Sequence, residues 1–454
     1  MSMNILVIGC GKIGTSVISS LVGEGHDVVA VDRNPDIISE ITNIYDVIGV
    51  CGNGADCRTL REASVERADL IVAATGSDEL NMLSCFMGKK MGASHTIARI
   101  RNPEYNGENL DFMRQQLGLS MAINPEMMAA HEMSNILKLP SAVKVDSFSR
   151  RYFEMIELRL KDDSGIEGVK LCDLRDKYKA FVLICVVQRG EQVYIPDGNF
   201  ELHSGDRIGI VGAPSEITKF LKSISMLKKQ AKDVMILGGS KSAYYLAKML
   251  DYSGNSVKII EMNEQKAQAL AEDLPGVTVI CGDGAQQELL LEEGLDSMDA
   301  FVALTGIDEE NILLSYFASG KDVPKVIAKV NRNEFTPIAE DLGIESIISP
   351  KDIVSDVVVR YVRALNNTVG SNMDTLYKIM DGKAEAAEFS VSNEFKFAGI
   401  PLRDIKLRKN ILIAGIIRGR RSIVPTGDDA IMAGDRVIVI AAAKRLNTLS
   451  DIFE

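Results

Sequence analysis

The chain has 454 residues, of which 46% are hydrophobic and 25% charged, a composition typical of a globular protein with an ample core. Its formal net charge of −12 argues against nucleic acid as a partner, because phosphate contacts require a basic surface. Its apolar runs fall short of the roughly 20 residues of a membrane-spanning helix, and its seven cysteines without a C-x-x-C pair indicate reduced thiols in the cytoplasm.

The first predicted elements carry the clearest motif. A strand that begins at Asn4, too early for a secretory signal, runs into a glycine-rich loop and a helix, and the next strand ends in an acid. The loop, the acid and the residue after it are Gly9, Cys10, Gly11, Lys12, Ile13, Gly14, Asp32 and Arg33. In dinucleotide-binding units such glycines shape the turn and admit the pyrophosphate, the helix N-terminus faces the phosphates, and the acid binds the ribose. Asp32 disfavours NADP, although Arg33 weakens that effect. Cys10 is interpreted as a small packing residue rather than an oxidation sensor.

Further along, strand-like runs alternate with helical patterns, which predicts a parallel sheet with helices on both faces. The predicted strands are 4–9, 27–32, 45–51, 68–75, 95–101 and 120–124. From Pro125 a helix-like stretch with many apolar positions leads to a break at Pro140, and we expect it to pack on a neighbour. Residues 144–225 then become rich in strands and turn signals.

The second half of the chain repeats the first. Gly238 lies 229 positions after Gly9, and Glu261 lies 229 positions after Asp32. CGNGA at 51–55 recurs as CGDGA at 281–285, ATGSDELN at 74–81 recurs as LTGIDEEN at 304–311, Arg99 is matched by Lys329, and 192–212 aligns with 421–441. The second glycine loop is altered to Gly238, Gly239, Ser240, Lys241 and Ser242, followed by Ala243. It therefore descends from a nucleotide loop, and its site is either weakened or specialised for a smaller nucleotide. The stretch 227–232 joins the halves, and 366–374 is predicted to be a looser connector.

The whole chain resembles the TrkA family, the tandem-RCK (regulator of K⁺ conductance) subunits of Trk-type potassium uptake systems. The resemblance rests on the first glycine loop with Asp32, on GNGAD, ATGSDELN and Arg99, and on a Pro…Gly-Asp-Arg strand pair in each half. It implies an α/β fold of two tandem RCK units, each a Rossmann-like parallel-sheet subdomain plus a small α+β C-terminal subdomain. The implied boundaries are 1–125, crossover helix 126–143, 144–226, 232–350, crossover helix and connector 351–373, and 374–454.

The same resemblance implies a function. The chain would be a cytosolic nucleotide-sensing subunit, not an enzyme, that gates a membrane K⁺ transporter of the Trk type. Four chains would form a ring on the inner face of the cell membrane, with NAD(H) as the expected cofactor and ATP or ADP as alternatives at the same or the second site. Two alternatives stay open: an NAD-dependent dehydrogenase, and a stand-alone nucleotide sensor that acts on a soluble partner. Against the dehydrogenase, residues 144–225 show repeat symmetry rather than a proton donor and a substrate clamp.

The implied binding residues extend beyond the glycine loops. In the first half they add Asn53, Gly54, Thr75, Gly76, Glu79 and Arg99, and in the second half Asp283, Thr305 and Gly306. Asn53 stands where the family usually has Asp. Asp78 and Glu79 are also consistent with a simple helix N-terminal charge pair, and Arg101 with an interface salt bridge. For the small subdomains, Arg189, Pro196, Arg418 and Pro425 are named as candidates for binding a cyclic dinucleotide.

Overall fold

The computed structural model describes residues 2–105, 107–149, 152–162, 164–366, 371–442 and 445–454. The chain forms two compact units, and each unit draws on both halves of the repeat. Unit 1 comprises Met1–Ser134 and Lys232–Val359, and unit 2 comprises Asn135–Ala231 and Arg360–Glu454. Unit 1 holds both parallel sheets and unit 2 holds both antiparallel sheets.

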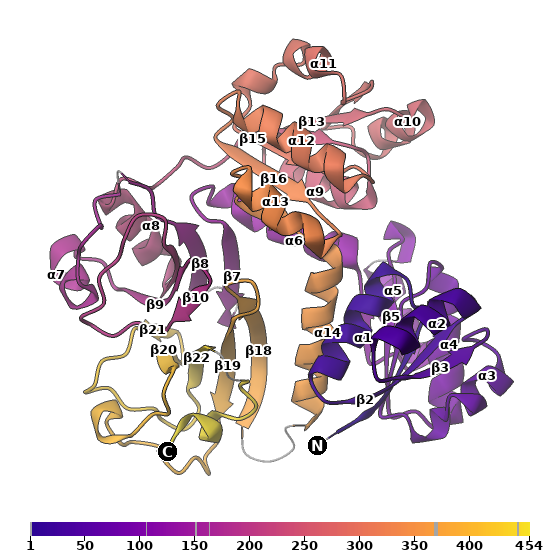
Figure 1. Ribbon diagram of the computed structural model, residues 1–454, viewed down its shortest axis with the longest axis horizontal. Helices are drawn as coiled ribbons and strands as arrows, with labels where there is room; N and C mark the ends of the chain where they lie inside the picture. The colour runs from indigo at the N-terminus through magenta and orange to yellow at the C-terminus, as the bar shows by residue number, and fades with distance from the viewer. Residues whose placement is uncertain (1, 106, 150–151, 163, 367–370, 443–444) are drawn as a thin grey trace. The chain divides into compact units, whose positions relative to one another are not determined.

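The first parallel sheet of unit 1 has the strand order β3-β2-β1-β4-β5-β6, and helices cover both of its faces (Figure 1). Its strands are β1 (Asn4–Ile8), β2 (Asp27–Asp32), β3 (Ile48–Cys51), β4 (Leu70–Ala73), β5 (His95–Arg99) and β6 (Met121–Ile123). Its helices are α1 (Lys12–Gly23), α2 (Pro35–Ile44), α3 (Cys57–Glu62), α4 (Asp78–Met91) and α5 (Glu108–Leu117). All six predicted strands are confirmed, most of them with slightly shorter ends.

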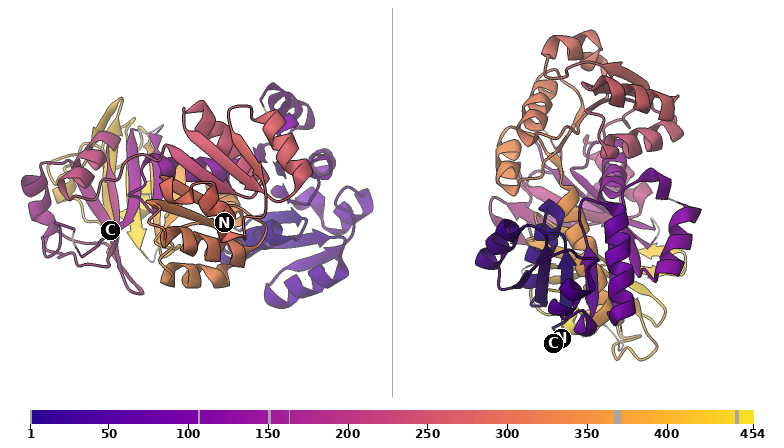
Figure 2. Two further views of the ribbon diagram at one scale, coloured as in Figure 1. Left: turned by 90° about the horizontal axis from the view of Figure 1, so that it is seen from above. Right: turned by 90° about the vertical axis from the view of Figure 1, so that its right-hand side faces the viewer.

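The second parallel sheet repeats this order as β14-β13-β12-β15-β16-β17. Its strands are β12 (Asp233–Leu237), β13 (Ser256–Glu261), β14 (Thr278–Cys281), β15 (Ala300–Ala303), β16 (Lys325–Lys329) and β17 (Ser346–Ile348). Its helices are α9 (Lys241–Tyr252), α10 (Glu264–Asp273), α11 (Gln287–Glu292), α12 (Asp308–Ser319) and α13 (Thr336–Asp341). The views in Figure 2 again show helices on both faces of the sheet. The internal repeat and the Rossmann-like fold are therefore confirmed.

The order of each parallel sheet determines where a ligand can bind. In the first sheet β1 pairs with β2 on one side and with β4 on the other. The connection after β1 therefore leads to one side of the sheet, and the connection after β3 leads to the other side. Strands β1 and β4 are almost completely buried, because helices lie against both faces. At such a switch point the loops after the two strands diverge and leave a crevice at their carboxyl ends.

Unit 2 contains two five-stranded antiparallel sheets of matching order, β10-β9-β11-β8-β7 and β18-β19-β22-β20-β21. The first is built from β7 (Lys144–Phe148), β8 (Phe153–Arg159), β9 (Val182–Arg189), β10 (Gln192–Tyr194) and β11 (Arg207–Gly212), with α7 (Leu174–Tyr178) and α8 (Pro214–Ser223). The second is built from β18 (Ser371–Ile379), β19 (Ala384–Val391), β20 (Ile411–Arg418), β21 (Arg421–Ile423) and β22 (Arg436–Ala442). One apolar cluster contains buried residues of both sheets, which explains why they form a single unit.

The repeated Gly-Asp-Arg sequence forms a tight turn before β11 and before β22. Gly205 has a φ of +81°, and the carboxylate of buried Asp206 accepts hydrogen bonds from Nε and Nη2 of Arg189, both at 2.8 Å. Asp435 and Arg418 repeat this paired contact at 2.9 and 2.7 Å. Arg189 and Arg418, named above as ligand candidates, thus each bind a buried aspartate that directly precedes a strand.

Two long helices, α6 (Pro125–Lys138) and α14 (Pro350–Asn366), connect the units along the chain. The prediction of a loose connector at 366–374 is wrong for its last part, because Ser371–Asp374 belong to β18, in which Ser371–Met373 pair with β19 and Asp374 lies at a bulge. Their Ser, Asn and Asp composition suggests a loop, but pairing with a neighbouring strand overrides that preference. Residues 367–370 lie outside the described part of the chain. No helix in the described ranges is long and apolar enough to cross a membrane.

A buried ion pair fixes the end of α14 within unit 2, and it provides a test of the packing. Arg363 donates to both carboxylate oxygens of Glu385 at 2.9 Å, and its side chain is 4% exposed. We expect Arg363→Ala to lower the free energy of unfolding by about 3–5 kcal/mol, because the buried Glu385 loses its only oppositely charged contact and keeps just the hydrogen bond from the Leu446 nitrogen. Urea unfolding followed by circular dichroism measures this. The control is Arg403→Ala, which breaks an exposed pair with Asp428 and should cost less than about 1 kcal/mol. Similar losses for both variants would contradict the prediction.

Candidate nucleotide-binding site

The first glycine loop lies at the switch point, between the ends of β1 and β4. Gly9 has a φ of +89°, and a Cβ there would lie 2.7 Å from the backbone nitrogen of Thr75. A Cβ on Gly14 would lie 1.9 Å from the carbonyl oxygen of Gly9, so this glycine lets α1 approach the loop. A Cβ on Gly11 would meet nothing within 4 Å. Two glycines are thus required by packing, whereas Gly11 leaves open space in front of the N-terminus of α1, where a phosphate group would fit.

Asp32 is held beside this loop by backbone donors. Its Oδ2 accepts a hydrogen bond from the Cys10 nitrogen at 2.7 Å, and its Oδ1 accepts one from Asn34 at 2.9 Å. Each carboxylate oxygen keeps a second lone pair that can accept from a ribose hydroxyl. Burial, followed by the charge of Asp32, raises the pKa of the Cys10 thiol to about 12. A thiol that stays protonated is a poor nucleophile, which favours the packing interpretation of Cys10.

A fully buried asparagine shapes the loop after β4. Asn81 accepts hydrogen bonds from the nitrogen and hydroxyl of Thr75 at 2.8 and 2.7 Å, and its amide donates to the Arg99 carbonyl at 2.9 Å. Asn311 makes the equivalent contacts with Thr305 and Lys329 in the second half. The sequence analysis included Asn81 in a repeated motif but assigned it no role. An asparagine occurs at this place in both copies of the repeat, and that recurrence could have identified it as a structural residue.

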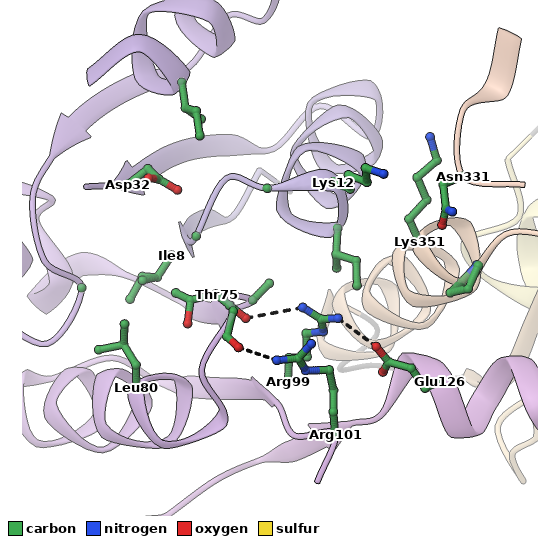
Figure 3. A pocket seen from close by; sticks show the side chains of 18 of the residues that line it. Ile8, Lys12, Asp32, Thr75, Leu80, Arg99, Arg101, Glu126, Asn331 and Lys351 are labelled. Carbon is green, nitrogen blue, oxygen red and sulfur yellow. Dashed lines mark hydrogen bonds and ion pairs between the residues drawn. The ribbon is translucent and has the colours of Figure 1, made fainter. Parts of the chain in front are cut away.

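Arg99 and Arg101 lie at the far side of the crevice (Figure 3). Arg99 donates to the Thr75 carbonyl at 3.4 Å and pairs with Glu126 at 3.0 Å. Arg101 donates to the carbonyl of Gly76, and its own backbone nitrogen donates to buried Asp78 at 2.8 Å. Burial lowers the pKa of Arg99, while Glu126 opposes that shift. Asp78 thus fixes the chain after β5, and Arg101 lines the crevice and pairs with Asp78 at 3.4 Å.

These groups line one cavity of about 660 Å³ within unit 1, a size typical of small-molecule sites. Of the predicted residues, it is lined by Gly9, Gly11, Lys12, Ile13, Asp32, Arg33, Gly54, Thr75, Gly76, Arg99, Ser240, Lys241 and Ser242. The cavity also receives residues that sequence reasoning did not place there, namely Ile8, Val31, Ile37, Gly52, Ala74, Leu80, Arg101, Glu126, Lys329, Asn331, Pro350 and Lys351. The second half therefore contributes to the wall of the first-half site.

Other predicted residues do not line this cavity. Cys10 and Gly14 pack behind the loop. Asn53 is exposed and accepts a hydrogen bond from Ala55 at 3.1 Å, the turn contact that Asp283 repeats. The remaining ones are Glu79, which accepts from Ser77 and Tyr105, and Gly238, Gly239, Glu261, Thr305 and Gly306, which lie at or near the ends of strands around the switch point of the second sheet.

The loop after β12 keeps the turn of the first glycine loop, with a φ of +89° at Gly238 as at Gly9, but differs in its polar groups. Oε2 of Glu261 accepts from the Gly239 nitrogen at 2.6 Å, and Oε1 accepts from Asn263 at 2.8 Å, so this carboxylate repeats the contacts of Asp32. Glu261 is only 9% exposed. The Ser240 hydroxyl caps α9 by accepting from the Ala243 nitrogen at 3.4 Å, so it takes up an N–H that a phosphate could otherwise use. This geometry supports the hypothesis of a weaker second site.

Three comparisons place the chain among known proteins. Models of the TrkA-N domain match residues 5–125 and 234–350, and models of the TrkA-C domain match 155–225 and 386–454. A Trk system potassium uptake protein TrkA homolog from Archaeoglobus fulgidus is 32% identical over 451 residues, covering 99% of this chain and 100% of the relative. The crystal structure of the GsuK RCK domain has a TM-score of 0.64 at 17% identity, covering 98% of this chain and 93% of that one. The GsuK channel bound to NAD has a TM-score of 0.61 at 16% identity, covering 98% and 77%.

The different surroundings of Asp32 and Glu261 lead to a binding prediction. We expect Asp32→Ala to weaken ADP binding by about 1.5–3 kcal/mol, the scale for hydrogen bonds to a charged group. The matched change Glu261→Ala should have a smaller effect. Isothermal titration calorimetry with ADP measures both. Equal losses would show that the two halves bind ADP alike.

Proposed function

This chain belongs to the TrkA family, and on that premise we propose that it is a cytosolic nucleotide-binding regulatory subunit that gates a membrane potassium transporter of the Trk type. The observation that carries the proposal is the first-half cavity, where a glycine loop, a helix N-terminus, a ribose-type acid and several cations meet. The full-length similarity to a Trk system potassium uptake protein supports the assignment to potassium transport.

The ligand is proposed to be NAD(H), with ATP or ADP as the alternatives. All of them carry an ADP moiety; in this proposal the Asp32 carboxylate would bind its ribose, and the open space before Gly11 would admit its pyrophosphate. A solved structure of similar fold is that of a channel bound to NAD. We propose further that four chains assemble into a ring on the inner face of the cell membrane, against the transporter.

The rival proposal, a dehydrogenase, finds less support at the cavity. No His, Tyr or Cys is among the described residues that line it. Glu126, the carboxylate nearest the far end, is held by Arg99, and the other carboxylate, Asp32, accepts backbone hydrogen bonds. The arrangement favours binding over proton transfer.

The gating proposal predicts that nucleotide identity controls transport. To move a two-state assembly from mostly closed to mostly open, the ligands must together bind the open state more tightly than the closed state by about 5 kcal/mol. Four sites that act together would each need to contribute about 1.3 kcal/mol. We expect exchange of ATP for ADP, or of NADH for NAD⁺, to change K⁺ flux in vesicles that contain this protein and its transporter. Arg99→Gln should reduce the difference while assembly, checked by size-exclusion chromatography, is retained. Flux that ignores every nucleotide while the protein stays bound would contradict gating.

The regulatory proposal also predicts an absence of turnover. Purified protein with NADH and a panel of carbonyl compounds should oxidise no more cofactor than buffer does, because no His or Tyr is among the described residues that line the cavity and Glu126 is paired with Arg99. Absorbance at the NADH band measures this. Steady oxidation that is lost in Glu126→Gln would instead favour the dehydrogenase.

A further inference from the structure

The turn after β3 contains a chemically reactive pair of residues to which the proposed function assigns no role. Asn53 is exposed and directly precedes Gly54, while Gly52 and Gly54 line the first-half cavity. We propose that Asn53 is a site of spontaneous deamidation, at which the side-chain amide becomes a carboxylate at the edge of this cavity. The reaction does not depend on the proposed nucleotide function, whereas its response to a bound nucleotide rests on that function.

Deamidation needs a nucleophile next to the side-chain amide. The backbone nitrogen of Gly54 loses its proton to hydroxide and attacks Cγ of Asn53, and Nδ2 is protonated by water and leaves as ammonia. Water then opens the resulting cyclic imide at one of its two carbonyl groups. The net change is one water consumed, one ammonia released, and an aspartate or an isoaspartate at position 53.

The turn supplies what this attack requires. The Gly54 nitrogen donates to none of the described residues, so no hydrogen bond has to break before it reacts. Oδ1 of Asn53 accepts a hydrogen bond from the Ala55 nitrogen at 3.1 Å. Negative charge develops on this oxygen during the attack, and a backbone donor that already points at it stabilises that charge. Gly54 also has no side chain to hinder closure of the ring.

Packing keeps the glycine of this pair in place. A Cβ on Gly54 would lie 2.2 Å from Cγ2 of Ile8, and a Cβ on Gly284 would lie 2.1 Å from Cδ1 of Leu237. A glycine is therefore required at this turn in both halves. The preceding residue differs, because it is an asparagine in the first half and an aspartate in the second.

The second half shows that an aspartate fits this turn. Oδ1 of Asp283 accepts a hydrogen bond from the Ala285 nitrogen at 3.0 Å, as Asn53 does from Ala55. An aspartate at position 53 can therefore keep the same turn, and it adds one negative charge to a chain whose formal net charge is −12. An isoaspartate would instead lengthen the backbone by one methylene and disturb the turn.

Two other asparagines show which feature of the turn matters. Oδ1 of Asn34 accepts from the backbone nitrogen two residues further on at 2.9 Å, and Oδ1 of Asn102 does so at 3.2 Å, so both form the same turn. Each of them is followed by a proline, which has no N–H and cannot attack. Of these three asparagines, Asn53 alone combines the turn with a nucleophile.

A bound nucleotide slows the reaction. Closure of the ring distorts the turn, because Cγ of Asn53 must reach the Gly54 nitrogen. A ligand that lies against Gly52 and Gly54 binds the undistorted turn and so lowers the population of the distorted one. Chains that stay without nucleotide therefore accumulate the carboxylate faster than occupied chains do.

The test follows the full-length protein during incubation at mildly alkaline pH by peptide mapping and mass spectrometry. We expect Asn53 to convert at least about tenfold faster than Asn34, its control on the same tryptic peptide, because proline removes the nucleophile. Asn53→Gln, whose longer side chain disfavours the five-membered ring, should stay unmodified at this position. Asn106, the other asparagine that precedes a glycine, lies outside the described residues and falls on a different tryptic peptide, so it is scored separately.

A second arm repeats the incubation with saturating ADP, after calorimetry has shown whether ADP binds. We expect ADP to slow the conversion of Asn53 more than about twofold. Rapid conversion that bound ADP does not slow overturns the link to occupancy and leaves the modification. If ADP, ATP and NADH all fail to bind, the proposed function fails, and rapid conversion still supports the modification. Conversion of Asn53 no faster than that of Asn34, or only after unfolding in urea, overturns the proposal.

Discussion

The close approach of Gly9 to the backbone of Thr75 is the contact on which the rest of the site depends. It brings the ends of β1 and β4 together at the point where the sheet changes direction, so the loops that follow must open outward. Asn81 then fixes Thr75 and the end of β5 with a satisfied, fully buried amide. A larger residue at position 9 would separate the strand ends, and the glycine loop, the threonine loop and Arg99 would lose their common geometry.

In the second half, Gly238 and Thr305 make the equivalent approach at a longer distance. A Cβ on Gly238 would lie 3.1 Å from Thr305, against 2.7 Å for the equivalent pair in the first half. Ala243 carries a real Cβ where Gly14 has none, so the loop there must lie farther from its helix. The two halves thus share a framework and differ at the positions that would face phosphates. Duplication preserved the sheet, whose packing constrains every strand, more strictly than it preserved the binding surface.

Local pattern was sufficient to predict the strands, the glycine loop, Asp32 and the repeat, because apolar runs and glycine spacing are properties of neighbouring residues. It could not predict that both parallel sheets share one unit, or that Lys329 and Lys351 reach the first-half cavity, since these depend on contacts between distant segments. Glu126 was missed for a related reason: it belongs to a helix that the pattern assigned only to packing. The start of β18 was misread because its polar residues form a strand only when β19 is present beside them.

The covalent joining of the two halves has a consequence for symmetry. When two identical chains meet around a two-fold axis, equivalent positions of the two chains carry the same residue. In this chain the two equivalent helix starts instead present Glu126 and Lys351 to one cavity. A fused pair can therefore hold opposite charges at positions where a symmetric pair would be forced to hold like charges. A single substitution alters one wall of the cavity, whereas in two identical chains it would alter both.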